Sequence, residues 1–115
     1  MTGALNISET RSGQVCVVAL NGRIDSSNAN DLMGRLTSLI GAGERSILVD
    51  FAQVLYLTSA AFRALLVATD EAERTATRFV LCNLAGHVRE LFEMGGLLEV
   101  FTIMPSREEA LKQLS

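Results

Sequence analysis

Residues 47–74 place a long apolar strand directly before a helix, and this order constrains the fold more than any other feature of the sequence. Residues 47–51 are apolar except for Asp50, as expected of a strand that is covered on both faces rather than half exposed to water. A link at residues 52–53 separates this strand from a second apolar piece at residues 54–57. Strands that are buried on both faces are typical of parallel sheets, so the sequence predicts an α/β fold.

The helix that follows this strand is predicted to begin at Ser59, with the side-chain oxygen of Thr58 as its N-cap. Successive residues advance by about 100° around a helix, which divides this one into two sides. The side expected to pack on the sheet, with Phe62 as its core anchor, consists of Ala61, Phe62, Leu65, Leu66, Ala68 and Ala72. The opposite side, which faces solvent or a partner, carries a stripe consisting of Ser59, Arg63, Val67, Asp70 and Arg74.

The rest of the chain alternates strands with helices. A hairpin is expected to turn at Gly13, and a central strand over residues 15–20 leads through a loop at Asn21-Gly22 into a helix that runs from Asn28 to Gly41. The later predicted elements are a strand at 78–82, a helix ended by Gly95-Gly96, a strand at 97–103, and a terminal helix with a capping box from Ser106 to Glu109.

This order of elements predicts how the layers are arranged. Crossovers between parallel strands are almost always right-handed, so the crossover helices of a sheet that grows in one direction all lie on the same face. We therefore expect an α/β domain with a mixed, mostly parallel sheet of four or five strands and helices mainly on one face. One such domain is predicted to occupy residues 1–115, a length that can bury a single core unaided.

Charge and composition exclude several classes of function. The formal net charge is -3 and the Lys and Arg residues do not cluster, which argues against binding to nucleic acid. The N-terminus has no basic segment followed by an apolar one, and the longest apolar run, residues 15–20, is far too short to span a membrane. We therefore expect a cytoplasmic protein that does not bind membranes. Cys16 and Cys82 are then expected to be reduced core thiols, with a disulfide as the alternative.

No constellation of catalytic residues can be recognised in the sequence. An enzyme would need a nucleophile with a base, paired carboxylates in a pocket, or a cluster of metal ligands. The only histidine, His87, has no second His, Cys or carboxylate at ligand spacing, so a surface histidine is favoured over a metal ligand. We therefore predict no enzymatic activity, no cofactor and no metal site.

Three segments, taken in order, resemble the STAS domain of bacterial anti-sigma-factor antagonists. The stretch from Leu55 through Thr58-Ser59-Ala60-Ala61 is similar to a family motif that reads apolar, Asp, Ser, Ser or Thr, Gly, Leu. Here Thr58 replaces the Asp, Ala60 the second hydroxyl residue and Ala61 the Gly. The other two segments are Gly22-Arg23-Ile24-Asp25, which resembles the family's Gly-Glu-Leu-Asp, and residues 88–97, which resemble its late helix and turn.

The resemblance implies a regulatory binding module. In that family the serine of the motif, which falls on Ser59, is phosphorylated by a partner kinase. The unphosphorylated domain would bind an anti-sigma factor that is also a serine kinase, phosphorylation would end that binding, and a metal-dependent serine phosphatase would restore it. The partner-binding residues expected on this basis are Asp25, Thr58, Arg63 and Val67.

Two alternatives remain at this point. Serine is common at helix starts, so Ser59 has a purely structural interpretation as well. The same fold also serves STAS-like accessory subunits of lipid or anion transporters, or scaffold components, that never meet a kinase.

Overall fold

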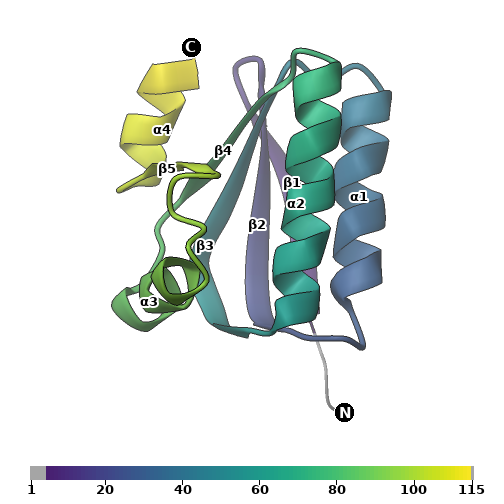
Figure 1. Cartoon of the computed structure of the whole chain (residues 1–115). Helices are drawn as coiled ribbons and strands as arrows, with labels where there is room; N and C mark the ends of the chain where they lie inside the picture. The colour runs from purple at the N-terminus through teal and green to yellow at the C-terminus, as the bar shows by residue number, and fades with distance from the viewer. Residues whose placement is uncertain (1–4, 115) are drawn as a thin grey trace.

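In a computed structural model of the chain, which describes residues 5–114, one five-stranded sheet carries four helices (Figure 1). The strand order β1-β2-β3-β4-β5 follows the chain; β1 is antiparallel to β2 and every other neighbouring pair is parallel. This confirms the predicted mixed, mostly parallel sheet. The elements are β1 (Leu5–Ser12), β2 (Val15–Ile24), α1 (Ala29–Gly41), β3 (Ser46–Leu57), α2 (Ser59–Arg74), β4 (Arg78–Cys82), α3 (Gly86–Met94), β5 (Thr102–Met104) and α4 (Arg107–Leu114).

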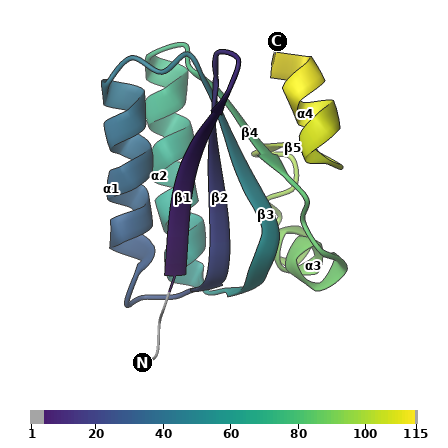
Figure 2. The same ribbon diagram turned by 180° about the vertical axis from the view of Figure 1, so that it is seen from behind.

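The helices are divided between the two faces of the sheet according to whether they connect parallel strands. The crossover helices α1, α2 and α3 all contribute to one large core on the same face, as the right-handed crossover rule predicts. The terminal helix α4 is not a crossover, and it packs on the other face through Ala110 and Leu114 against Val15, Leu48 and Val80. Figure 2 shows this second face of the sheet in front of α1 and α2.

Strand β3 is longer than predicted, because the expected link at residues 52–53 lies inside one continuous strand. Pairing with β2 moves from Ala19 opposite Asp50 to Asn21 opposite Gln53, so β3 contains one extra residue at this point. Such a β-bulge interrupts the alternation of inward and outward side chains without ending the strand. The apparent break in the apolar pattern is therefore a bulge and not a loop.

The last strand is shorter than predicted, since only Thr102–Met104 of the expected 97–103 segment joins the sheet. The backbone N–H of Leu97 bonds to the Phe92 carbonyl at 2.8 Å, and the N–H of Val100 bonds to the Leu97 carbonyl at 3.1 Å. Gly96 has a φ of 70° in this turn, a conformation that favours glycine. The apolar residues of this segment pack on the core from turns, which is why they resemble a strand in the sequence.

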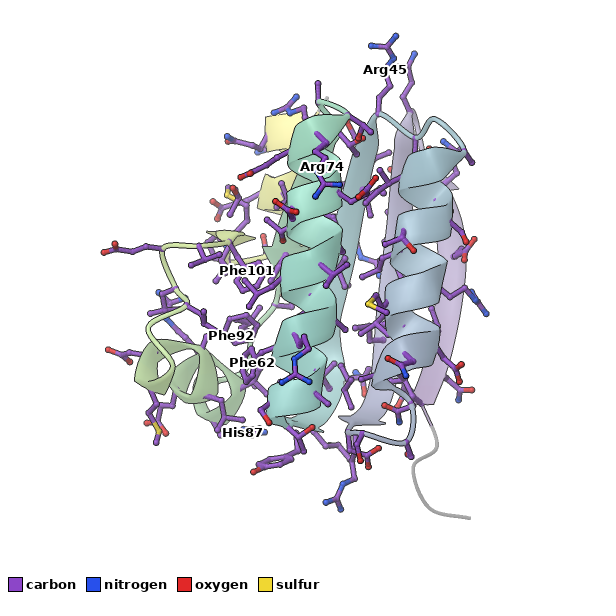
Figure 3. All side chains as sticks on the ribbon, turned by 45° about the vertical axis from the view of Figure 1, so that its right-hand side comes forward. Arg45, Phe62, Arg74, His87, Phe92 and Phe101 are labelled. Atoms are coloured by element: carbon purple, nitrogen blue, oxygen red, sulfur yellow. The ribbon has the colours of Figure 1, made fainter. Side chains whose placement is uncertain are left out.

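The core on the α1–α2 side is centred on Phe92 of α3 rather than on the predicted anchor, Phe62. Phe62 is partly buried and stands edge-to-face with Phe92, with ring centroids 4.9 Å apart (Figure 3). Leu66, which was also expected to face the sheet, is 37% exposed, because it lies at the margin of the buried arc of α2. The remaining members of the predicted arc are buried as expected: Ala61, Leu65, Ala68 and Ala72.

The two cysteines lie on opposite faces of the sheet. Cys16 belongs to the core beneath α1 and α2, whereas Cys82 belongs to the core beneath α4. Both are free thiols, in agreement with the predicted reduced state. Burial, with a smaller contribution from the Asp50 carboxylate, raises the pKa of Cys82 to about 12, so this thiol is protonated at neutral pH.

The one acidic residue of the β3 apolar run, Asp50, has a structural role on the α4 face. Its buried carboxylate accepts hydrogen bonds from the Ala52 backbone N–H at 2.9 Å, Asn83 Nδ2 at 3.1 Å and Arg107 Nε at 2.9 Å. Arg107 is the first residue of α4. The network therefore joins β3, the end of β4 and the start of α4. Each hydrogen bond that the Asp50 carboxylate accepts lowers the free-energy cost of burying its charge.

Replacing Arg107 with alanine is expected to lower the free energy of unfolding by about 1–3 kcal/mol, because it removes a charged donor from a buried carboxylate. Chemical denaturation measures the loss. Arg74→Ala is the matched control, because the ion pairs of Arg74 with Asp70 and Glu71 are exposed and worth roughly 0–1 kcal/mol. Equal losses in the two variants would contradict the structural role of the Asp50 network.

Candidate functional site

The predicted site residues gather at the edge of the sheet where β2 and β3 end. These strands are parallel, so their carboxyl ends meet at the same edge, which is a common position for sites in α/β proteins. The Thr58 backbone N–H bonds to the Ile24 carbonyl at 3.0 Å, which places Thr58 directly beside the start of the β2–α1 loop. Asp25, the first residue of that loop, is thereby brought close to Thr58, although the two are 33 positions apart in the sequence.

Ser59 is the first residue of α2, as predicted, and its side chain is exposed. Its hydroxyl makes no hydrogen bond with any of residues 5–114. The first turn of α2 contains no acidic residue, so no carboxylate there repels a second negative charge. A helix N-terminus carries a partial positive charge. The position is therefore accessible to a modifying enzyme, and the start of the helix itself favours an added anion.

Thr58 occupies the N-cap position, but the predicted capping bond is absent. Its hydroxyl lies 3.4 Å from the Ile24 carbonyl and donates to that oxygen. Its backbone carbonyl instead accepts from the N–H groups of Ala61 at 3.0 Å and Phe62 at 3.3 Å. Thr58 therefore connects the start of α2 to β2. The predicted side-chain cap does not form, because the hydroxyl is directed at the Ile24 carbonyl and the Ala61 N–H is bonded to the Thr58 carbonyl.

Asp25 is held by the loop that it begins. The backbone N–H of Ser27 donates to Asp25 Oδ1 at 2.9 Å, and the Ser27 hydroxyl donates to the same oxygen. These two bonds lower the pKa of Asp25, the hydroxyl bond being the larger cause. A charged Asp25 carboxylate therefore lies at the edge of the sheet that also carries Ser59. The Ser27 hydroxyl is hydrogen-bonded to this carboxylate, whereas the Ser59 hydroxyl has no hydrogen bond with residues 5–114.

Asn28 organises the same loop, and the sequence analysis assigned it no such role. Its buried side chain accepts from the Asp25 backbone N–H at 3.0 Å and donates to the Arg23 carbonyl at 2.9 Å. The helix α1 then begins at Ala29. Asparagine is common at helix starts, so Asn28 could have been recognised as marking the start of α1. Its side-chain contacts with Asp25 and Arg23 could not, because they depend on how the loop folds.

Arg63 and Val67 are exposed on the outer side of α2, on the predicted stripe that begins at Ser59. Both line a groove of about 260 Å³ that runs between α1 and α2. Small side chains, Ala29, Ala60 and Ala64, help to form this groove, and Met33 contributes an apolar wall from α1. The stripe is therefore one side of a hollow between two helices, which the pattern of α2 alone did not indicate.

Exposed apolar side chains are concentrated around the same segment. Of the six large ones among residues 5–114, four lie between positions 55 and 67, whereas Met94 and Val100 lie elsewhere. Leu55 is 62% exposed and Tyr56 is 45% exposed at the end of β3. Single exposed apolar residues are ordinary, but a concentration of them marks a surface used for interaction. The sequence analysis did not single out Leu55 and Tyr56, because they lie in an apolar run typical of a core strand.

His87 lies at the margin of this region, at the start of α3 (Figure 3). Its ring nitrogen Nε2 is 3.0 Å from the Leu55 carbonyl, so it links α3 to the exposed end of β3. Among the described residues, His, Cys, Asp and Glu side chains do not form a group of three that could hold a metal ion. None of the helices within residues 5–114 is long and apolar enough to cross a bilayer.

Comparison with known proteins agrees with this architecture. The family model of the STAS domain matches residues 6–110, which is most of the chain. This chain belongs to the STAS domain family. One curated relative, named "Putative anti-sigma factor antagonist BtrV" and found in Bordetella bronchiseptica, is 35% identical over 94 residues, or 82% of this chain and 81% of that protein.

Solved structures share the STAS fold at lower sequence identity. An anti-sigma factor antagonist from Mycobacterium paratuberculosis superposes with a TM-score of 0.85 at 20% identity, covering 98% of this chain and 96% of that one. The anti-sigma factor antagonist SpoIIAA in its unphosphorylated form superposes with a TM-score of 0.72 at 21% identity, covering 96% and 97% of the two chains. SpoIIAA of Bacillus has also been solved in a phosphorylated form. At these identities the likeness concerns the fold.

Proposed function

We propose that this STAS domain is an anti-sigma-factor antagonist that works by partner switching. In its unphosphorylated state it binds an anti-sigma factor that is also a serine kinase, which frees the sigma factor to act in transcription. Phosphorylation of Ser59 ends this binding, and a metal-dependent serine phosphatase restores it. The domain acts in the cytoplasm as a binding protein without catalytic activity of its own, and it contacts neither nucleic acid nor membrane.

One observation carries this proposal: Ser59 is exposed and free of hydrogen bonds to the described residues, in a segment that also exposes the apolar side chains of Leu55, Tyr56 and Val67. An accessible hydroxyl suits a kinase substrate, and an exposed apolar surface suits a protein partner. The 35% identity to a protein named as an anti-sigma factor antagonist supports the same function. The two solved forms of SpoIIAA add that phosphorylation occurs on a protein of this fold.

The departures from the family motif leave this site usable. Thr58 replaces the usual aspartate, and its hydroxyl is directed at the Ile24 carbonyl rather than at Ser59. Ala61 replaces a glycine and is completely buried, so it does not reach the surface that a partner would contact. We therefore propose Ser59 as the phosphoacceptor, with Asp25, Thr58, Arg63 and Val67 as partner-binding residues.

Incubation with ATP and the partner serine kinase is expected to transfer one phosphate to Ser59, detected by mass spectrometry of the digested protein. Ser59→Ala should abolish the transfer. Ser38→Ala is the control, because Ser38 is also an exposed serine but does not line the groove between α1 and α2, and this variant should be phosphorylated on Ser59 like the wild type. Phosphate on Ser26, Ser27 or Thr58 in place of Ser59 would contradict the assignment, and no phosphate at all would favour a STAS subunit without a phosphoswitch.

A further inference from the structure

The groove between α1 and α2 has the size of a receptor for a protein side chain. Its volume of about 260 Å³ lies below the roughly 300–1,000 Å³ of typical small-molecule sites. Ala60 and Ala64 of α2 face Ala29 of α1 across it, and these short side chains leave the hollow open. Met33 and Val67 add larger apolar surface. A single large apolar side chain from a partner fits this description better than a cofactor does.

Arg63 stands in the lining of this groove with its charge uncompensated. Its side chain is exposed and makes no ion pair or hydrogen bond with residues 5–114. Arg74, at the other end of the same helix, pairs with both Asp70 and Glu71. Arginine is enriched among the residues that dominate binding at protein interfaces, and its planar fork recognises carboxylates and phosphates. The groove is lined mostly by apolar side chains, although Ser26 and Asn30 also belong to its lining. Together with the charge of Arg63, it is complementary to a segment that carries an acidic residue next to a large apolar one.

Arg63 also lies one helical turn after Ser59. Residues four apart on a helix are neighbours, and Cα–Cβ bonds tilt toward the helix N-terminus, so a side chain at position 63 is within reach of a phosphate on Ser59. A phosphate on Ser59 carries about -1.5 to -2 charges at neutral pH, more than a single carboxylate. The Arg63 guanidinium can therefore pair with a carboxylate of the binding protein before phosphorylation, or with the phosphate on Ser59 after it.

We propose that Arg63 and the α1–α2 groove recognise an acidic-apolar segment of the protein partner, and that phosphate on Ser59 ends binding by capturing Arg63. This inference rests on the proposed function and names the chemistry of its partner surface. The apolar side chain of the segment enters the groove beside Met33 and Val67, and its carboxylate pairs with Arg63. After phosphorylation, Arg63 is neutralised by its own helix, and the partner's carboxylate is left opposite a phosphate of like charge.

The test measures the affinity of the kinase for four forms of the full chain by isothermal titration calorimetry: wild type, Ser59→Asp, Arg63→Ala and the double variant. Arg63→Ala is expected to weaken binding roughly thirtyfold, the loss typical of a dominant interface arginine. Ser59→Asp should then weaken binding by a smaller factor in the Arg63→Ala background than in the wild type. Arg74→Ala removes the same charge from the far end of α2 and should bind like the wild type. Met33→Ala should weaken binding as well, because Met33 lines the groove.

A second measurement needs no partner. In protein phosphorylated on Ser59, the phosphate pKa observed by ³¹P NMR should be lower with Arg63 present than in Arg63→Ala, because a paired cation favours the dianion. Equal phosphate pKa values with and without Arg63 would contradict the pairing of Arg63 with the phosphate. So would an equal loss of kinase affinity on Ser59→Asp in the wild-type and Arg63→Ala chains. Neither result would contradict partner switching itself. A wild-type chain that neither binds the kinase nor accepts phosphate from it would overturn the proposed function itself.

Discussion

Replacing Phe92 with alanine is expected to lower the free energy of unfolding by about 3–5 kcal/mol, the largest effect on stability predicted for this domain. Phe92 is completely buried, and its ring meets three others edge-to-face. The centroid distances are 6.0 Å to Phe51, 4.9 Å to Phe62 and 5.5 Å to Phe101. Each such pair contributes roughly 0.5–1.5 kcal/mol beyond the buried area, and alanine removes all three and leaves a cavity.

Urea denaturation monitored by circular dichroism measures this loss. The matched control is Met94→Ala on the same helix, where the side chain is 83% exposed and the expected change is within about 0.5 kcal/mol. Phe62→Ala should give an intermediate loss, because Phe62 is only partly buried and contacts the cluster through one ring. A loss from Phe62→Ala equal to or larger than that from Phe92→Ala would show that the cluster is not centred on Phe92. A domain of this kind has about 5–15 kcal/mol of stability in total, so Phe92→Ala removes a large share of it.

Ser59→Asp is expected to weaken binding to the partner kinase by about 2–5 kcal/mol, or roughly thirtyfold to a few thousandfold. A surface that packs against a neutral hydroxyl would then have to desolvate a charge that has no cation supplied for it by the partner. Ser59→Ala adds no charge and should bind like the unphosphorylated wild type. Isothermal titration calorimetry with the kinase measures both affinities, and an Asp variant that binds like the wild type would contradict electrostatic release.

The same Ser59→Asp variant is expected to remain folded. The first turn of α2 has no acidic residue, and an anion at a helix N-terminus gains roughly 0.3–1 kcal/mol from the helix dipole. The thermal midpoint from circular dichroism should therefore be equal to or slightly above that of Ser59→Ala. A lower midpoint for the Asp variant would show that the charge acts by disturbing the fold rather than the interface.

Much of the architecture was predictable because its signals are local. The continuous apolar run of β3, the start of α2 at Ser59 and the turn at Gly13, whose φ is 61°, depend on residues that are adjacent in the chain. The hairpin register joins Ser12 to Val15 around that glycine. The strand β2, in contrast, continues to Ile24 through the predicted loop at Asn21-Gly22, because pairing with β3 resumes there after an irregularity. Asn21 and Gly22 favour a turn locally, but backbone hydrogen bonds to β3 keep them in the strand.

The candidate site was predictable in its parts but not in its shape. The order of apolar strand, hydroxyl residues and helix identified Ser59 and the stripe of Arg63 and Val67 from α2 alone. The groove beside them requires α1 as well, because Ala29 and Met33 reach it from more than 20 residues away in the sequence. The exposure of Leu55 and Tyr56 likewise could not be predicted from the apolar run, because Val54 and Leu57 on either side of them are buried in the core.

The sequence by itself therefore determined the elements, their order and the face on which the crossover helices pack, because periodicity, turn residues and the handedness of crossovers are properties of short segments. Only the tertiary structure decided where α4 packs, how much of residues 97–103 forms a strand, and what satisfies the buried Asp50. Arg107 reaches Asp50 from 57 positions away, and Phe92 brings together rings from β3, α2 and the turn before β5. Contacts of this kind depend on which surfaces meet after folding, and no local pattern in the chain encodes them.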